Sequence, residues 1–133
     1  MDVLKINGRV YPVKYLGITE SYTVLYSSNT GRTLSQGAEM KLDPLGTFYS
    51  HRVRVKRIKG QETAFDELFR YISKPRYDGV PVEIVHGQRT LKYDAYFSEG
   101  SRALRRVDEK TGKVIWDELE FDIIPIKAQV YPL

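Results

Sequence analysis

The chain has 133 residues, a net charge of +4 and no cysteine. The absence of thiols excludes disulfide scaffolds, cysteine nucleophiles and thiolate metal sites. A composition of 41% hydrophobic and 29% charged residues is that of a globular protein, so we expect one domain over residues 1–133. No secretory signal is visible at the first residues, and no apolar run approaches the roughly 20 residues of a membrane helix. We therefore expect folding in a cytoplasm and no membrane partner.

Most of the sequence alternates apolar and polar residues with period two, which is typical of antiparallel strands. Residues 4–6 and 9–11 flank Asn7-Gly8, and this dipeptide favours a tight hairpin because a type I′ turn needs positive φ at both central residues. Gly17 predicts an edge or a bulge in the strand that follows.

Residues 27–37 are polar with two glycines and predict a long loop, which in a small domain is usually functional or mobile. Residues 43–46, Asp-Pro-Leu-Gly, fit a type I turn. The strand expected over residues 47–58 carries Arg52, Arg54 and Lys56 on one face and His51, Val53 and Val55 on the other.

One amphipathic helix is expected at about residues 63–73. Thr63 is its expected N-cap, with Asp66 three residues on, and Phe65, Leu68 and Ile72 recur at helical spacing. A helix this short is marginal alone, so its apolar stripe must pack against a sheet.

Two more hairpins follow the helix. The first joins residues 80–85 to 91–97 through His86-Gly87, and the second joins 102–108 to 113–124 through residues 109–112. In the last strand the apolar residues change from even positions, Val114 and Trp116, to odd positions from Leu119 onward. One regular strand cannot place both sets on the same face, so a bulge is expected near Asp117-Glu118. The fold class is therefore mainly β (β-rich α+β): an antiparallel β-sandwich, barrel or strongly curved sheet of about eight strands with one flanking helix.

Catalytic signatures are not found in the sequence. His51 and His86 are the two histidines that could act as a base, and no nucleophile elbow accompanies them; we expect a half-buried His51 and an exposed His86 in a turn. Neither a phosphate-binding loop nor metal-ligand spacing is present, although three acidic residues on one strand face could hold a cation: Glu118, Glu120 and Asp122. We expect no enzyme activity, no metal and no cofactor.

Nucleic-acid binding is the main alternative function. Arginine-rich strands at residues 52–59 and 102–106, with ten tyrosines available for stacking, are typical of such proteins. The acidic strand face offers those cations a cross-strand or cross-subunit partner, which is the commoner fate of a charged strand.

As a whole the sequence resembles the short tail proteins of phages and prophages of low-GC Gram-positive bacteria. The segments that carry the resemblance are Lys5-Ile6-Asn7-Gly8 followed by Pro12, Arg32-Thr33 with Gly37 and Asp43, Phe65-Asp66-Glu67-Leu68-Phe69, Tyr93-Asp94-Ala95-Tyr96, Thr111-Gly112-Lys113, and Trp116-Asp117-Glu118-Leu119-Glu120-Phe121 ending at Ile124-Pro125. They span nearly the whole chain, and each is a structural element rather than a catalytic motif.

This resemblance implies a tail-tube or distal-tail fold that assembles into rings, commonly six-fold, in the virion tail. The expected partners are further copies of the chain, other tail proteins, and DNA that passes through a lumen without specific binding. The chain is shorter than tube proteins, so a connector, tail-terminator or baseplate-hub role is equally implied.

Candidate subunit-interface residues lie in the polar loop, as an arm that orders on stacking or as a mobile loop, and on the charged strands: Asn29, Arg32, Thr33, Leu34, Arg52, Arg54, Lys56, Glu118, Glu120 and Asp122. We expect the three acidic residues to lie nearer the lumen or to pair with the basic strand.

Overall fold

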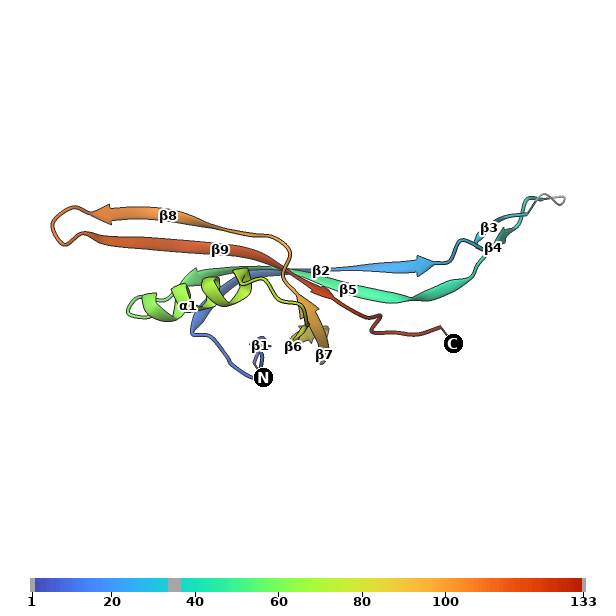
Figure 1. Cartoon of the computed structure of the whole chain (residues 1–133), viewed down its shortest axis with the longest axis horizontal. Helices are drawn as coiled ribbons and strands as arrows, with labels where there is room; N and C mark the ends of the chain where they lie inside the picture. The colour runs from blue at the N-terminus through green and yellow to red at the C-terminus, as the bar shows by residue number, and fades with distance from the viewer. Residues whose placement is uncertain (1, 34–36, 133) are drawn as a thin grey trace.

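The structure is a computed structural model that describes residues 2–33 and 37–132. It is mainly β with one helix, which confirms the expected class, and its body is a seven-stranded antiparallel sheet, with a separate two-stranded pair at one end (Figure 1). The elements in chain order are β1 (Leu4–Ile6), β2 (Val13–Tyr26), β3 (Gly31–Arg32), β4 (Met40–Lys41), β5 (Pro44–Arg57), α1 (Glu62–Ser73), β6 (Val80–His86), β7 (Arg89–Tyr96), β8 (Gly100–Asp108) and β9 (Lys113–Pro125).

The longest pairing joins β2 to β5. The predicted alternation of β5 is confirmed, because Val53 and Val55 are fully buried and His51 shares their face. The predicted irregularity in β2 is also confirmed, as a register shift between Tyr15 and Gly17.

The turn predicted at residues 43–46 is wrong. Pro44 already begins β5, and Gly46 lies opposite Leu25 of β2. Proline is tolerated as the first residue of a strand, and β2 supplies pairing partners for Pro44 and Gly46, so tertiary pairing overrides the local turn preference.

The first hairpin is confirmed only at its turn. Asn7 and Gly8 have φ of 51° and 78°, as the type I′ geometry requires, but residues 9–11 form no strand beyond an isolated bridge from Arg9 to Ile6. The partner of β1 is β6 instead. Sequence periodicity identifies strands but not which distant strand will pair with them.

Helix α1 begins one residue earlier than predicted. Its N-cap is Gln61, without a side-chain capping hydrogen bond, so the expected Thr63 cap is wrong. Phe65, Leu68 and Ile72 are buried, as the helical spacing predicted, and hold the helix against the sheet.

The hairpin formed by β8 and β9 is confirmed with its four-residue connection, since Asp108 lies opposite Lys113. The bulge is confirmed as well: Ala103 lies opposite Glu118 and Leu104 opposite Trp116, which leaves Asp117 as the extra residue on β9. The bulge turns Asp117 inward, where it is 5% exposed.

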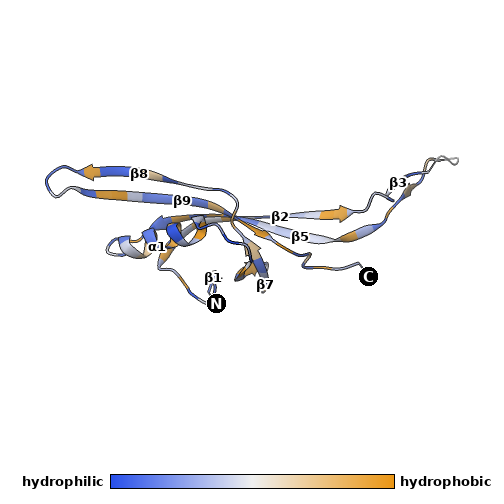
Figure 2. Ribbon diagram, viewed as in Figure 1, coloured by the Kyte–Doolittle hydropathy of each residue, from blue (hydrophilic) through white to orange (hydrophobic). Residues whose placement is uncertain are grey.

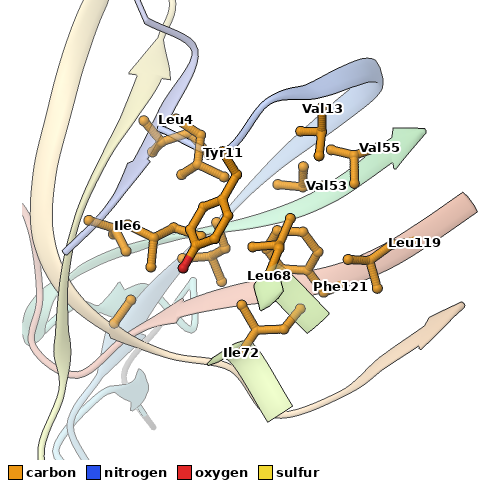
Figure 3. Close-up of a cluster of buried hydrophobic side chains, with 14 of the residues drawn as sticks. Leu4, Ile6, Tyr11, Val13, Val53, Val55, Leu68, Ile72, Leu119 and Phe121 are labelled. Atoms are coloured by element: carbon orange, nitrogen blue, oxygen red, sulfur yellow. The ribbon is translucent and has the colours of Figure 1, made fainter. Parts of the chain in front are cut away.

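Strand β9 is the junction of the sheet, because it pairs with β5, β7 and β8. Its inward side chains, Leu119, Phe121 and Ile123, are at most 1% exposed. Leu68 and Ile72 of α1 lie close to Phe121 and Leu119 at the centre of the core (Figure 3).

The molecule is elongated. From the body, β8 and β9 extend in one direction and β2 and β5 in the opposite one, with β3 and β4 at the far end (Figure 1). We call residues 103–117 the β8–β9 arm and residues 19–50 the β2–β5 arm. The chain exposes 9422 Å², whereas a compact monomer of 15.4 kDa exposes about 7,200 Å². The extended shape therefore exposes about 2,200 Å² more than a compact shape would.

A segment after β9 lies along the edge of the β2–β5 arm, and we call residues 126–132 the strap. The Thr47 amide donates to the Val130 carbonyl at 2.8 Å. The Gln129 side chain accepts from the Tyr49 amide at 3.0 Å and donates to the Tyr49 carbonyl at 2.9 Å. An amide side chain thus supplies the hydrogen bonds that a neighbouring strand would give.

Candidate functional site

The basic and acidic strands predicted from the sequence are neighbours within one chain. Arg52 Nε donates to Glu120 Oε1 at 2.9 Å, and this hydrogen bond raises the pKa of Arg52. The basic strand β5 therefore pairs with the acidic strand β9 inside one subunit. In register, the opposed pairs are Arg52 with Asp122, Arg54 with Glu120, and Lys56 with Glu118.

The polar loop residues lie at the tip of the β2–β5 arm. Asn29 is exposed and its amide donates to Ser27 Oγ at 3.1 Å. Arg32 donates to the Ala38 carbonyl at 3.3 Å, and Thr33 donates its amide to the Glu39 carbonyl at 2.8 Å. Leu34 lies outside the described residues. Part of the predicted loop, residues 31–32, thus forms β3, which pairs with β4.

Large apolar side chains remain exposed along both arms. Figure 2 shows apolar segments near the far ends of β2 and β8. Tyr22 is 71% exposed on the β2–β5 arm, and Val107 is 50% exposed on the β8–β9 arm. Other apolar residues of the arms that are exposed are Leu25, Tyr26, Met40, Leu42, Leu45, Leu104 and Val114.

The base of the β8–β9 arm is fixed to α1 by Arg102. Its guanidinium lies 4.1 Å from the Phe69 ring centroid and 4.5 Å from that of Trp116, and it donates to Asp66 at 2.9 Å. Cation–π contacts with two rings and a charge-assisted hydrogen bond hold one side chain in place. This arginine is therefore engaged in packing within the chain.

Asp117 gathers cations at the bulge. Its carboxylate lies 3.1 Å from Arg105, 3.6 Å from Arg57 and 3.9 Å from Lys56. A nearly buried carboxylate needs such partners, because burying an unpaired charge is costly. The bulge and its cations together fix the point where the β8–β9 arm leaves the body.

Both histidines of the chain converge on one carboxylate oxygen. His51 Nε2 lies 2.7 Å from Glu20 Oε2, and His86 Nδ1 lies 2.9 Å from the same oxygen. On its other side, His51 Nδ1 lies 3.0 Å from the Tyr93 hydroxyl, and the Tyr49 ring packs on His86 with centroids 4.6 Å apart. We call Glu20, Tyr49, His51, His86 and Tyr93 the histidine cluster.

One placement of protons satisfies every group in this cluster. The Tyr93 hydroxyl donates to His51 Nδ1, and His51 Nε2 and His86 Nδ1 both donate to Glu20. His51 is then neutral, as a side chain only 2% exposed should be.

The electrostatics of the cluster agree with this placement. Burial lowers the pKa of His51 below its ordinary value of 6.5, although the hydrogen bond to Glu20 opposes the shift. Burial alone would raise the pKa of Glu20, but hydrogen bonds from His86 and His51 outweigh it and lower that pKa. Burial raises the pKa of Tyr93. At neutral pH the Glu20 carboxylate is therefore an anion that accepts hydrogen bonds from the two imidazole rings.

The sequence predictions for the two histidines are wrong. His51 is fully buried rather than half-buried, and His86 is the last residue of β6, opposite Arg89, rather than a turn residue. Glu20 was not singled out, because it is 66 residues from His86. The available signal was His51 on the apolar face of β5, since a buried imidazole requires a polar partner.

The cluster has the hydrogen-bond order of a proton relay, with side chains 30% exposed at His86 and 33% exposed at Glu20. His51 is enclosed, and Ser21 and Ser50 are opposed to each other at the adjacent register position, on the other face of the strands. Within residues 2–33 and 37–132, no group of three or more histidine, aspartate or glutamate side chains is arranged to hold a metal ion.

No protein-family model matches the chain, and no curated protein matches it in sequence. Among the described residues, no helix is long and apolar enough to cross a membrane.

Proposed function

We propose that the chain is a structural subunit of a phage or prophage tail that acts by assembling into rings. The tube, tail-terminator or connector, and distal-tail or baseplate-hub positions are all compatible with the resemblance stated above. The single observation that best supports assembly is the exposed surface of 9422 Å², an excess of about 2,200 Å² over a compact monomer. A stable protein–protein interface buries about 1,200–2,000 Å² in total, so the excess is enough for one.

The nature of the exposed surface also favours assembly. Two-stranded hairpins are marginally stable in water unless something packs on them, and both arms carry exposed apolar side chains such as Tyr22 and Val107. Strand β2 ends the sheet order with β5 as its one described neighbour. A long exposed edge of 14 residues is a template for pairing with another chain.

Two arms that extend in opposite directions suit heterologous contacts, in which one surface of a subunit meets a different surface of the next. Such contacts close into a ring when the rotation between subunits permits it. The proposed partners are further copies of the chain and other tail proteins, with DNA in the lumen.

Light scattering after size exclusion, with negative-stain images, tests the proposal. We expect a discrete multiple of 15.4 kDa and ring-shaped particles. The double variant Tyr22→Lys, Leu25→Lys places charge at exposed apolar positions on both faces of the β2–β5 arm and should abolish the large species. The matched control is Tyr77→Lys, since Tyr77 is fully exposed and lies outside both arms. A monomer at every concentration, or equal loss in the control, contradicts the proposal.

Nucleic-acid binding is the alternative proposal, and the pairing of the arginines argues against it. Arg52, Arg102 and Arg105 each contact a carboxylate of the same chain. Counterion release makes nucleic-acid affinity fall steeply with salt, whereas an apolar ring interface is much less sensitive. A salt titration of binding and of assembly therefore separates the two functions.

A further inference from the structure

The histidine cluster lies where the core ends and the β2–β5 arm begins. On β5, Val53 and Val55 are buried in the core, and His51 is the next buried residue toward the N-terminal end of the strand. The residues of β5 that precede His51 belong to the arm. Glu20 lies directly opposite His51 on β2. The cluster therefore occupies the base of the arm.

The same cluster holds the turn end of the β6–β7 hairpin. At its open end this hairpin is joined to β9 through two residue pairs, Ala95 with Pro125 and Tyr96 with Ile124. At its turn end, His86 contacts Glu20 and Tyr49. The hairpin is thus held by a short backbone ladder at its open end, by buried side chains of β6 such as Val82 and Ile84 in the core, and by a titratable contact at its turn end.

We propose that the histidine cluster is an acid-sensitive latch that holds the turn end of the β6–β7 hairpin against the base of the β2–β5 arm at neutral pH and releases that end on acidification. This inference rests on the fold alone and not on the proposed function. Release changes the orientation of the arm relative to the hairpin, because the side chains of the cluster bridge them at that end.

The direction of the pH effect follows from the groups that face one another. The cluster draws on four strands: Glu20 comes from β2, Tyr49 and His51 from β5, His86 from β6, and Tyr93 from β7. Two further residues face the histidines. Arg89 of β7 lies opposite His86, and the apolar Ile123 of β9 lies opposite His51. Proton binding to His51 places a positive charge in a buried site, which is unfavourable. It also removes the lone pair on His51 Nδ1 that accepts from the Tyr93 hydroxyl, so this hydroxyl must turn away. Proton binding to Glu20 removes the anion that both imidazoles contact.

The pKa shifts of His51 and Glu20 have the same direction. The pKa values of His51 and Glu20 are lower in the closed latch than in water, so the open form binds more protons. By linkage, the closed form is fully favoured above the ordinary histidine value of 6.5 and loses stability as the pH falls below it.

Spin-label distances test the latch directly. The chain has no cysteine, so Lys41→Cys on β4 and Thr90→Cys on β7 give a clean pair that reports the arm against the hairpin. The measurement is made at a dilution where light scattering finds no assembly, so that failure of the latch is distinguishable from failure of the proposed function. Between about pH 7.5 and about pH 5 we expect the distance distribution to broaden about two-fold or to shift to a second maximum.

Variants identify the groups responsible. Glu20→Gln removes the charge and should give the broad distribution at both pH values; His86→Gln, at the edge of the cluster, should do the same if Glu20→Gln fails to fold. The matched control is Glu83→Gln, since Glu83 on β6 pairs with Lys92 at 3.3 Å and is outside the cluster. An unchanged distribution in the parent across the pH range overturns the latch, as does a Glu83→Gln effect equal to that of Glu20→Gln.

Discussion

Replacing Phe121 with alanine should remove a large part of the stability of the domain. Phe121 is fully buried on β9, the strand that pairs with three others, and its ring packs edge-on against Phe97 with centroids 6.1 Å apart. Truncating a buried phenylalanine to alanine costs about 3–5 kcal/mol, of which the aromatic pair contributes about 0.5–1.5 kcal/mol. Domains of this kind are stable by about 5–15 kcal/mol, so Phe121→Ala should leave a marginally folded protein.

Urea unfolding followed by circular dichroism measures this cost, at a concentration where one species is present. The matched control is Val114→Ala on the same strand, where the side chain is 46% exposed and the expected cost is below about 1 kcal/mol. Phe121→Leu should fall between the two, because it keeps most of the volume. If Phe121→Ala costs no more than Val114→Ala, the placement of the core around β9 is wrong.

Two further substitutions test a contact at the base of the β8–β9 arm and a contact along the β2–β5 arm. Arg102→Lys keeps the charge but loses the planar stacking, so it should cost about 1–2 kcal/mol. It should also shift the fluorescence of Trp116, the one tryptophan, to longer wavelength. An unchanged spectrum would refute the stacking of Arg102 on the Phe69 and Trp116 rings. Gly46→Val should displace the strap, because a Cβ at residue 46 would lie 2.6 Å from Ala128 Cβ. Hydrogen exchange at the Thr47 amide should then accelerate, and equal protection in both proteins would show that the strap is not held there.

Local patterns in the sequence predict most of the strands and the helix. The alternation of Val53 and Val55 with basic residues, and the type I′ turn at Asn7-Gly8, depend on neighbours a few positions away, so the sequence alone contains them. The turn predicted at residues 43–46 fails because its residues are in strand pairing with β2, a contact that spans about 20 residues. Pairing partners, and hence the two opposed arms, are set by tertiary contacts.

The histidine cluster shows why the site was harder to predict than the fold. Glu20, His51 and His86 are each unremarkable in a strand, and their meeting depends on the β2–β5 register together with the docking of β6. Only His51, on an otherwise apolar face, indicated that a polar partner was needed. The charged strands were easier, because opposite alternation on two strands predicts that they pair.

The central position of β9 has a consequence for how the chain folds as it is synthesised. The strand begins at Lys113 and completes the pairing of β5, β7 and β8, so the core cannot close completely until translation has passed it. Long-range pairing of this kind is slow, since loop closure precedes the gain from contact. Until then β2 and β5, already emerged, have unpaired edges and exposed apolar faces, and this is the interval in which the nascent chain is most open to aggregation.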